Sequence, residues 1–460
     1  MEKREFTDLE DIRLVYRGNK ILDDLFRKSV HSIRQVCSDD ASAKGVYRFL
    51  LNDRVSEEDI VSNMATNCRN SCKGKLVLCI QDTSEINLSS HSKRLKKDND
   101  IGTNYLHSGQ GLGFFIHPSL VIDAETFIPY GFADVRVWNR PMEFQSKKDR
   151  SYNQLPIEQK ESYKWIETSK NTQLALQDTV TGMIIVQDRE GDIYEQFASI
   201  PNAQTSLLIR VSQNRLLTDG TKLFDSLLNC PVVDTYELPI EGKGERKKRT
   251  AILEVRYREV EIKSSKSGIN PSLPASIRLN LIEVKEADYI GEDRIHWRLL
   301  TNIQVDSVEV ANTCVQWYRC RWMIEEVFKI LKKEGFNVEA SELEYAASIR
   351  KLSLMILEVI IKLFLMRLAY AEPETPLSAD SCFNEDEQTF LEHQITHLEG
   401  RTEKRKNPYK TKDLKRYVWA IARLGGWKGY ESKRHPGITT LWLGFKQFYA
   451  SYQGWCIHRN

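Results

Sequence analysis

The chain has 460 residues, of which 41% are hydrophobic and 28% are charged, and its formal net charge at pH 7 is +2. This is the composition of an ordinary soluble globular protein, long enough for about two to four domains. Its nine cysteines include no Cys-x-x-Cys pair, which argues against a disulfide framework and against a zinc ribbon. Because the net charge is only mildly basic, a surface that binds nucleic acid must come from local clusters.

Two stretches bear on where the protein resides. The N-terminal stretch MEKREFTDLED lacks the apolar core of a signal peptide. The most apolar stretch, from Leu352 to Tyr370, contains Glu358 and Lys362, which disfavours a membrane span. The sequence therefore predicts a cytoplasmic protein that does not use a membrane.

Residues 1–70 are predicted to be helical throughout. Apolar residues recur at helical spacing, a second helix is expected over residues 42–51, and Ser56 followed by two glutamates is a typical N-cap. Short helices with several arginines and lysines, Arg48 among them, suit a DNA-binding module of helix-turn-helix character. A helical cap on a larger domain remains the alternative.

Two short apolar runs, at residues 75–82 and 183–188, both end in the dipeptide Gln-Asp. Such a run indicates a strand buried on both faces, so Asp82 and Asp188 are expected where these strands emerge at their carboxyl ends. Catalytic groups gather at that edge in α/β sheets. Either Asp alone is more often a turn or a helix cap, but the matching pair favours one shared site.

The remaining elements of this region follow a recognisable order. Strands are predicted at residues 114–123, 132–138 and 206–211, a helix at 194–200, and a polar surface segment at 142–163. The order strand, strand, strand, helix, strand, helix, strand is that of a ribonuclease H-like α/β domain.

Residues 212–303 have a different character. Two long segments, 251–263 and 276–285, alternate apolar and polar residues, which predicts an inserted antiparallel sheet. Trp297 lies at the end of this insert. One of its turns carries a basic cluster suited to a phosphate backbone, although a solvated hairpin loop is an equally good interpretation; the cluster consists of Lys243, Arg246, Lys247, Lys248 and Arg249.

The segment from Trp317 to Lys333 is predicted to be one uninterrupted helix that stops at Gly335. Four of its residues are spaced three, four and seven positions apart and so share one stripe: Tyr318, Arg321, Glu325 and Lys332. A carboxylate among these cations suits a metal ligand beside phosphate-binding groups. An exposed helix with ordinary charge pairs explains the spacing equally well.

The last part of the chain is divided by composition. Residues 380–413 are polar and are predicted to be a linker. From Leu414 onward the chain is rich in Trp, Phe and Tyr, which predicts a small helical unit that buries these rings in a partner or self-association face. The predicted domains are thus a helical DNA-binding module (1–70), an α/β catalytic domain with an inserted β subdomain (71–370), and a linker with a C-terminal helical dimerisation unit (371–460).

The pattern Tyr-x-x-Arg-x-x-x-Glu-x-x-x-x-x-x-Lys that begins at Tyr318 resembles the Tyr-Arg-Glu-Lys signature of DDE transposases of the insertion sequence 4 family. A series of motifs in the same order extends the resemblance over nearly the whole chain: GVYRFLLNDRVS, IQDTS, VWNRP, KESYKW, QDREGDIY, RIHWRLLTN and YVWAIARLGGW. Such an ordered series is far more specific than an acidic triad alone.

The resemblance implies cut-and-paste DNA transposition of a bacterial insertion sequence. Asp82, Asp188 and Glu325 would hold two Mg²⁺ ions about 3.5–4 Å apart, with Mn²⁺ expected to substitute. The implied steps are nicking, hairpin formation and resolution, and strand transfer into target DNA. Trp297 would stack on a flipped base. Other side chains would contact DNA, namely Tyr318, Arg321, Lys332, Arg210, Arg48, Lys247 and Lys248.

The implied partners are double-stranded DNA, at the inverted terminal repeats and at the target, and a second copy of the chain in a paired-end complex. The expected location is the bacterial cytoplasm, with the nucleoid. Two alternatives stay open: a non-catalytic repressor or retired transposase, and a structure-specific nuclease on the same fold. The three acids with their basic stripe argue against the first, and the insert with Trp297 and the aromatic C-terminal unit against the second.

Overall fold

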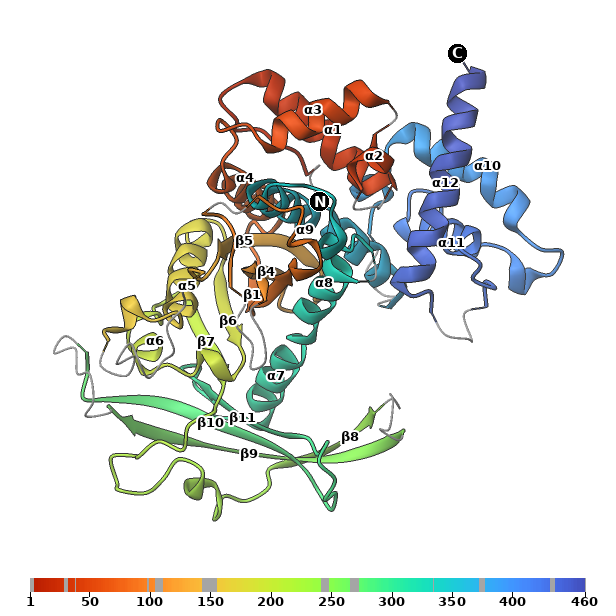
Figure 1. Ribbon diagram of the computed structural model, residues 1–460. Coiled ribbons are helices and arrows are strands. Elements are labelled where there is room, and N and C mark those ends of the chain that lie inside the picture. The colour runs from red at the N-terminus through yellow and green to blue at the C-terminus, as the bar shows by residue number, and fades with distance from the viewer. Residues whose placement is uncertain are drawn as a thin grey trace.

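The computed structural model describes the chain except residues 1–3, 29–31, 38, 97–98, 104–110, 143–154, 241–247, 265–272, 334, 372–376, 431–434 and 460. It has a mixed α/β fold, with one large mixed sheet and helices packed around it (Figure 1). Its helices are α1 (Ile12–Lys28), α2 (Ile33–Val36), α3 (Asp40–Leu50), α4 (Glu57–Ser71), α5 (Tyr163–Leu176), α6 (Tyr194–Ser199), α7 (Val308–Arg319), α8 (Trp322–Lys332), α9 (Ala346–Ala371), α10 (Glu385–Leu398), α11 (Leu414–Leu424) and α12 (Ile438–Arg459).

The strands belong to a single sheet. They are β1 (Leu76–Gln81), β2 (Ser84–Asn87), β3 (Gly102–Thr103), β4 (Leu112–Asp123), β5 (Pro129–Trp138), β6 (Gly182–Gln187), β7 (Thr205–Arg210), β8 (Asp234–Ile240), β9 (Arg249–Lys263), β10 (Ser276–Glu286) and β11 (His296–Thr301). Their order is β2-β4-β1-β6-β7-β11-β10-β9-β8, with β3 and β5 also paired to β4.

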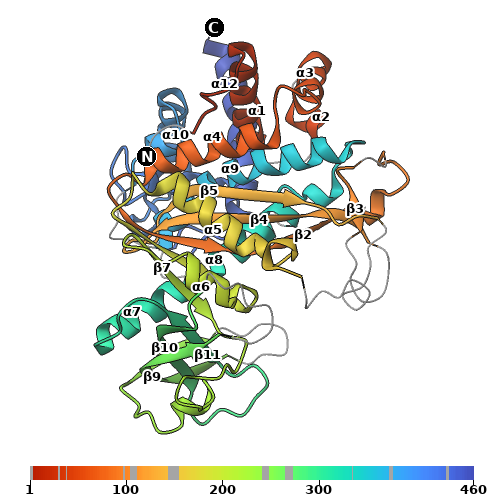
Figure 2. The same cartoon turned by 90° about the vertical axis from the view of Figure 1, so that its left-hand side faces the viewer.

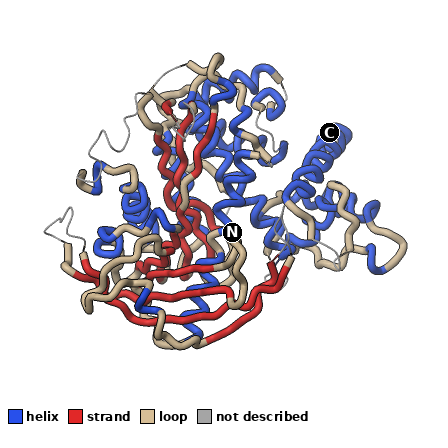
Figure 3. The backbone as a smooth tube through the Cα atoms, turned by 60° about the horizontal axis from the view of Figure 1, so that its bottom comes forward, coloured by secondary structure: helices blue, strands red, loops and turns tan. Residues whose placement is uncertain are grey.

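The direction of the strands changes along the sheet. β1 is antiparallel to β4 but parallel to β6, and β6 is parallel to β7. β11 joins β7 in antiparallel fashion, and β8 to β11 continue as an antiparallel sheet. The predicted antiparallel insert is therefore confirmed, and it extends the main sheet. Figure 3 shows its long strands turning away from the direction of the core strands.

Helices pack against the core strands, and helices also make up the N-terminal part of the chain. α4 and α9 lie along β5, whereas α5 packs against β4 and β5 (Figure 2). The helical character predicted for the first 70 residues is confirmed by α1 to α4. The predicted N-cap is confirmed too, because Ser56 accepts a hydrogen bond from the Asp59 amide at 3.0 Å within a capping box.

The prediction of one continuous helix from Trp317 to Lys333 is wrong. α7 ends at Arg319 and α8 begins at Trp322. Between them the Arg321 amide donates to the carbonyl of Tyr318 at 3.0 Å, an i to i+3 hydrogen bond of the tighter 3₁₀ type. No Pro or Gly marks this turn in the sequence, so it arises from tertiary contacts. Tyr318 consequently stands on α7 and Glu325 on α8.

The predicted linker at residues 380–413 is also wrong in part, because it contains α10. The Asn384 side chain accepts from the Glu387 amide at 2.8 Å, and the Glu387 carboxylate accepts from the Asn384 amide at 3.0 Å. This capping box, with acidic residues in the first helical turn, stabilises the start of the helix. The Asn-x-x-Glu spacing was a readable signal for it.

Four of the C-terminal aromatics lie inside the chain, whereas Trp427 and Trp442 are partly exposed. Trp419, Phe445, Phe448 and Tyr449 are buried within the chain itself. The ring of Phe445 packs edge-on against Phe26 of α1, with 5.1 Å between centroids. α11 and α12 pack so closely that a side chain at Gly444 would collide with the backbone of α11. The rings gather because three helices and α1 offer an apolar core within one copy.

One buried ion pair ties the N-terminus to the apolar helix α9. Glu358 is only 3% exposed, accepts from Arg4 Nε at 2.8 Å, and accepts from Asn67 Nδ2 at 2.9 Å. Together these donors satisfy a carboxylate that would otherwise be costly to bury. No helix in the described part of the chain is long and apolar enough to cross a membrane.

Candidate active site

Asp82 and Asp188 emerge side by side from the same edge of the sheet. In the parallel pairing of β1 with β6, Ile80 lies opposite Val186, so the two acids follow at matching positions. The preceding glutamines are buried, and Gln187 Nε2 donates to Gln81 Oε1 at 2.7 Å. The placement of both acids at the carboxyl ends of adjacent strands is as the sequence predicted.

The hydrogen bonds beneath the acids were not predicted. Gln187 Nε2 also lies 3.2 Å from Ser169 Oγ of α5, and Gln196 of α6 donates to both Gln187 and the backbone carbonyl of Gly191. These bonds lock the two strand ends to α5 and α6, and so fix the directions in which the acids leave the sheet. The sequence prediction used the aspartate of each Gln-Asp dipeptide, and the repeated glutamine was the signal left unused.

Arg321 connects Glu325 of α8 to the strand-end acid Asp82. The Arg321 guanidinium donates to Asp82 Oδ2 at 3.1 Å through Nη1 and to Glu325 Oε1 through Nη2. Its side chain is 17% exposed, whereas that of Glu325 is 57% exposed. Arg321 therefore bridges a strand-end acid to the helical acid, and Glu325 faces the more open side.

Tyr318 and Arg210 contact the other strand-end acid. The Tyr318 hydroxyl donates to Asp188 Oδ1 at 3.4 Å, and Arg210 Nη1 lies 4.0 Å from the same oxygen. Burial raises the pKa of Tyr318 to about 12, so its hydroxyl keeps its proton at neutral pH. Tyr318 thus acts as a hydrogen-bond donor that orients Asp188.

Asp82 has a distinctive protonation equilibrium. Burial raises its pKa to about 6 from an ordinary 3.8, in spite of the Thr83 amide and Arg321, which act in the opposite direction. The folded state therefore binds this proton more tightly than the unfolded state, so Asp82 contributes less to stability as pH rises from about 4 to 6. A cation near Asp82 would favour its charged form.

We expect Asp82→Asn to raise the thermal unfolding midpoint of the metal-free protein at pH 7.5 by more than at pH 4, because the cost of burying the charge builds up between about pH 4 and 6 and is complete above that range. Unfolding followed by calorimetry at both pH values measures this. An equal change at both pH values would show that Asp82 titrates normally.

The side chains of Asp82, Asp188 and Glu325 offer only carboxylate oxygens, the type of ligand atom that a hard divalent cation prefers. In the described part of the chain, however, no three His, Cys, Asp or Glu side chains are already placed to hold one ion. The reason is visible at Arg321, whose guanidinium binds both Asp82 and Glu325.

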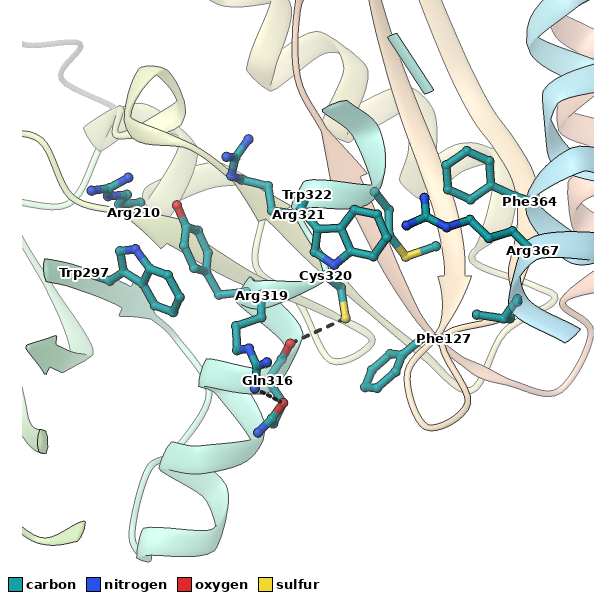
Figure 4. A pocket seen from close by; sticks show the side chains of 13 residues that line it. Phe127, Arg210, Trp297, Gln316, Arg319, Cys320, Arg321, Trp322, Phe364 and Arg367 are labelled. Atoms are coloured by element: carbon teal, nitrogen blue, oxygen red, sulfur yellow. Dashed lines mark hydrogen bonds between the residues drawn. The ribbon is translucent and has the colours of Figure 1, made fainter. Parts of the chain in front are cut away.

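A cavity of about 580 Å³ opens beside these residues (Figure 4). Its wall is rich in aromatic rings and guanidinium groups: Phe127, Arg210, Trp297, Gln316, Tyr318, Arg319, Cys320, Arg321, Trp322, Met323, Phe364, Arg367 and Leu368. We call it the aromatic pocket. Trp297 and Arg210 stand at one end of it, whereas Phe364 and Arg367 stand at the other.

Trp297 meets Tyr318 edge-on in this pocket, with 5.6 Å between ring centroids. At the far end, the indole of Trp322 is 45% exposed and lies 5.1 Å from the guanidinium carbon of Arg367. Trp297 was predicted from sequence, but Trp322 and Arg367 were missed. A tryptophan three residues before Glu325 was the available signal, while the position of Arg367 depends on how α9 packs.

The other predicted DNA contacts lie elsewhere. Lys332, near the end of α8, pairs with Glu339 at 3.4 Å. Arg48 is exposed on α3, at the top of Figure 1, whereas the β insert lies at the bottom. In the basic turn Lys248 is exposed, but Lys243, Arg246 and Lys247 lie outside the described residues. Arg249 begins β9 and pairs with Glu286 at 2.9 Å and with Asp293 at 2.7 Å, so it belongs to the insert's own ion pairs.

Comparison with known families bears on the N-terminal helices. Residues 2–55 match the family model described as Transposase DNA-binding. The match covers α1, α2 and α3, the helices whose basic residues predicted DNA binding. It supports DNA as a partner of this chain and a transposase as the kind of protein to which the N-terminal module belongs.

Among solved structures, a likeness is found to the piggyBac transposase in a cryo-electron microscopy structure of its synaptic complex with hairpin DNA. The TM-score is 0.37 and the sequence identity 10%, over 82% of this chain and 70% of that chain. A TM-score below 0.5 is too low to indicate a shared fold, so no conclusion about this chain follows from it.

Proposed function

We propose that this chain is a metal-dependent DNA transposase that excises an element by cut-and-paste transposition, in the manner of the insertion sequence 4 family. The observation that supports the proposal is that Arg321 joins Asp82 to Glu325 while Tyr318, three residues before Arg321, contacts Asp188, and that both Tyr318 and Arg321 line the aromatic pocket. The match of residues 2–55 to a transposase DNA-binding model supplies the means of reaching DNA. The path β5-β4-β1-β6-β7, with β4 antiparallel to the parallel strands, supports a ribonuclease H-like core.

Asp82, Asp188 and Glu325 would hold two Mg²⁺ ions, for which Mn²⁺ would substitute. When bound, such ions supply a nucleophile at neutral pH and neutralise charge that develops on the phosphate oxygens. The protein's own part is to hold the three carboxylates. The buried Gln81–Gln187 hydrogen bond joins the ends of β1 and β6, so the acids that follow them stay at matching positions. The Tyr318 hydroxyl orients Asp188.

Arg321 has two sets of partners in this proposal. In the free protein it neutralises Asp82 and Glu325. Were the carboxylates held by cations instead, the Arg321 guanidinium would be available to bind a phosphate oxygen in bidentate fashion. The same side chain thus stabilises the acids before DNA arrives and positions the scissile phosphate afterwards. Lys332, about two turns beyond Glu325 on α8, is proposed as a further phosphate contact.

The aromatic pocket is proposed to receive a flipped base, with Trp297 as one stacking surface. Hairpin formation bends the strand sharply, and removing one base from the stack relieves that strain. The volume of about 580 Å³ and the mixture of rings with guanidinium groups suit a nucleotide. Arg210, at one end of this pocket, would contact the adjoining phosphate.

Trp297→Ala is expected to separate the reaction steps, because an indole face contributes about 1–3 kcal/mol of base stacking. Initial nicking should proceed at nearly the wild-type rate, while hairpin formation or resolution slows by about tenfold or more. Denaturing gels of timed reactions on end-labelled DNA separate the nicked strand, the hairpin and the resolved end. Equal slowing of all steps in a folded variant would instead indicate that Trp297 only supports the position of Tyr318.

A paired-end complex of two copies is part of the proposal, and it rests on the resemblance to the family. The C-terminal helices motivate it less than their composition suggested, because Trp419, Phe445, Phe448 and Tyr449 are buried within one copy. Native gels of the full chain with end DNA, at several protein concentrations, test whether two ends are held together.

The experiment that tests the proposed function uses purified protein, Mg²⁺ and a plasmid with the DNA that flanks the gene on both sides. We expect a linear excised element and its insertion into a second plasmid. Nicking without joining would support a structure-specific nuclease. Binding without cleavage, in Mg²⁺ and in Mn²⁺, would support a repressor or a retired transposase.

A further inference from the structure

A second cavity, of about 320 Å³, lies next to the aromatic pocket. Five of the residues that line it carry basic side chains, and the others are Val211, Ser212 and Phe224; the basic ones are Arg189, Arg210, Arg294, His296 and Arg298. None of the described residues in this lining is acidic. We call it the cationic cavity.

Strand β11 separates the two cavities. Side chains alternate between the faces of a strand, so His296 and Arg298 point to one side and Trp297 to the other. His296 and Arg298 line the cationic cavity, whereas Trp297 lines the aromatic pocket. Arg210 lines both, because it ends β7 opposite Leu299 of β11. The start of β11 therefore has aromatic rings on one face and basic side chains on the other.

Two of the guanidinium groups are fixed by neutral partners. Arg294 donates through Nε and Nη2 to the backbone carbonyl of Glu286, at 2.9 and 2.6 Å. Arg210 Nη2 donates to the backbone carbonyl of His296 at 3.2 Å. Carbonyl oxygens carry no net charge to offset that of Arg294, whereas Arg210 also lies 4.0 Å from Asp188 Oδ1. Each guanidinium also has further N–H groups to offer to an anion.

A single buried carboxylate, Glu283, contacts two of the other three basic side chains. Glu283 Oε1 lies 2.8 Å from His296 Nε2 and accepts from Arg298 Nε at 3.0 Å. Burial alone would raise the pKa of Glu283, but the hydrogen bond from His296 and the charge of Arg298 lower it overall. Glu283 is thus ionised and orients both side chains, while the Arg298 guanidinium also lies 4.1 Å from the ring of Phe224. One carboxylate offsets only part of the charge in the cavity.

From this arrangement we propose that the cationic cavity binds one backbone phosphate of the DNA strand whose flipped base occupies the aromatic pocket. The inference rests on the proposed function for the identity of the strand, but the anion site itself does not. Preorganised guanidinium groups bind phosphate oxygens strongly because little side-chain entropy is lost. The phosphate would fix the strand at the point where its base leaves the stack.

The experiment measures how tightly the full chain binds a fluorescein-labelled single-stranded 20-mer, as a function of NaCl concentration. The test variant is Arg189→Gln combined with Arg294→Gln, with Arg278→Gln as a matched control, because Arg278 is an exposed arginine of the same insert sheet outside the cavity. Losing one phosphate contact should reduce the slope of log K against log salt by about 0.7, and the control should leave it unchanged. Glu283→Gln should tighten binding at low salt.

The experiments distinguish failure of the proposed phosphate site from failure of the proposed function. If the double variant keeps the wild-type slope while its thermal midpoint is normal, the cationic cavity does not bind phosphate, whatever the protein does to DNA. If the slope falls as expected but the wild-type protein never cleaves DNA, the proposed function fails and the anion site stands. Should the double variant not fold, each single variant is compared with Arg278→Gln, and a slope equal to the control in both overturns the inference.

Discussion

Replacing Glu325 with glutamine is expected to lower the rate of DNA cleavage by at least about 10²–10³-fold. The change keeps the size and helix propensity of the side chain nearly constant, but a neutral amide is a poor ligand for Mg²⁺. Arg321 retains Asp82 as a partner, so the fold should persist. Binding of end DNA, measured by gel shift, should be as tight as in the wild type or slightly tighter, since a negative charge is lost.

Glu326 provides the matched control for this change. It is the next residue on α8 and points toward α9, where it pairs with Arg367 at 3.0 Å. Glu326→Gln carries the same chemical change on the same helix and should reduce cleavage far less. If Glu326→Gln abolished cleavage while Glu325→Gln cut normally, the acid assigned to the site would be the wrong one.

Arg4→Ala is expected to reduce the free energy of unfolding by about 3–5 kcal/mol, because it leaves the Glu358 carboxylate buried without its charged partner. Asn67 still donates to Glu358 but cannot neutralise it. Urea unfolding followed by circular dichroism measures the change. Combining Arg4→Ala with Glu358→Leu removes the uncompensated charge and should recover much of the loss.

Arg13→Ala serves as the control for this prediction. Arg13 pairs with Asp11 at 2.8 Å, but its side chain is 86% exposed, and exposed pairs add little to stability. Its unfolding midpoint should match that of the wild type. A midpoint for Arg4→Ala equal to that of Arg13→Ala would show that the Arg4–Glu358 pair does not hold the N-terminus to α9.

The elements that place the acids were readable from the sequence because their signals are local. The apolar runs of β1 and β6 need burial on both faces, and each ends in Gln-Asp, so the positions of Asp82 and Asp188 followed without knowledge of the rest of the chain. Glu325 followed from its spacing to Tyr318 and Arg321, which survives even though the helix between them is interrupted.

The features that were missed depend on contacts between distant parts of the chain. The turn at Cys320 and Arg321 contains no helix-breaking residue, and Arg321 binds Asp82, which lies 239 positions earlier. The C-terminal rings looked like a partner surface because their neighbours Phe26 and Phe383 come from other segments. The cationic cavity likewise gathers residues from β7, from the turn after β6 and from β11. Local patterns carry no information about such pairings.

The most direct test of the central claim is the number of Mn²⁺ ions bound to the complex of the protein with its end DNA, counted by electron paramagnetic resonance. If Asp82, Asp188 and Glu325 hold the ions, the wild-type complex binds two ions per chain, and Asp82→Asn, Asp188→Asn and Glu325→Gln each lower the number or the affinity in parallel with cleavage. Unchanged Mn²⁺ binding in all three variants, with cleavage intact, would contradict the claim.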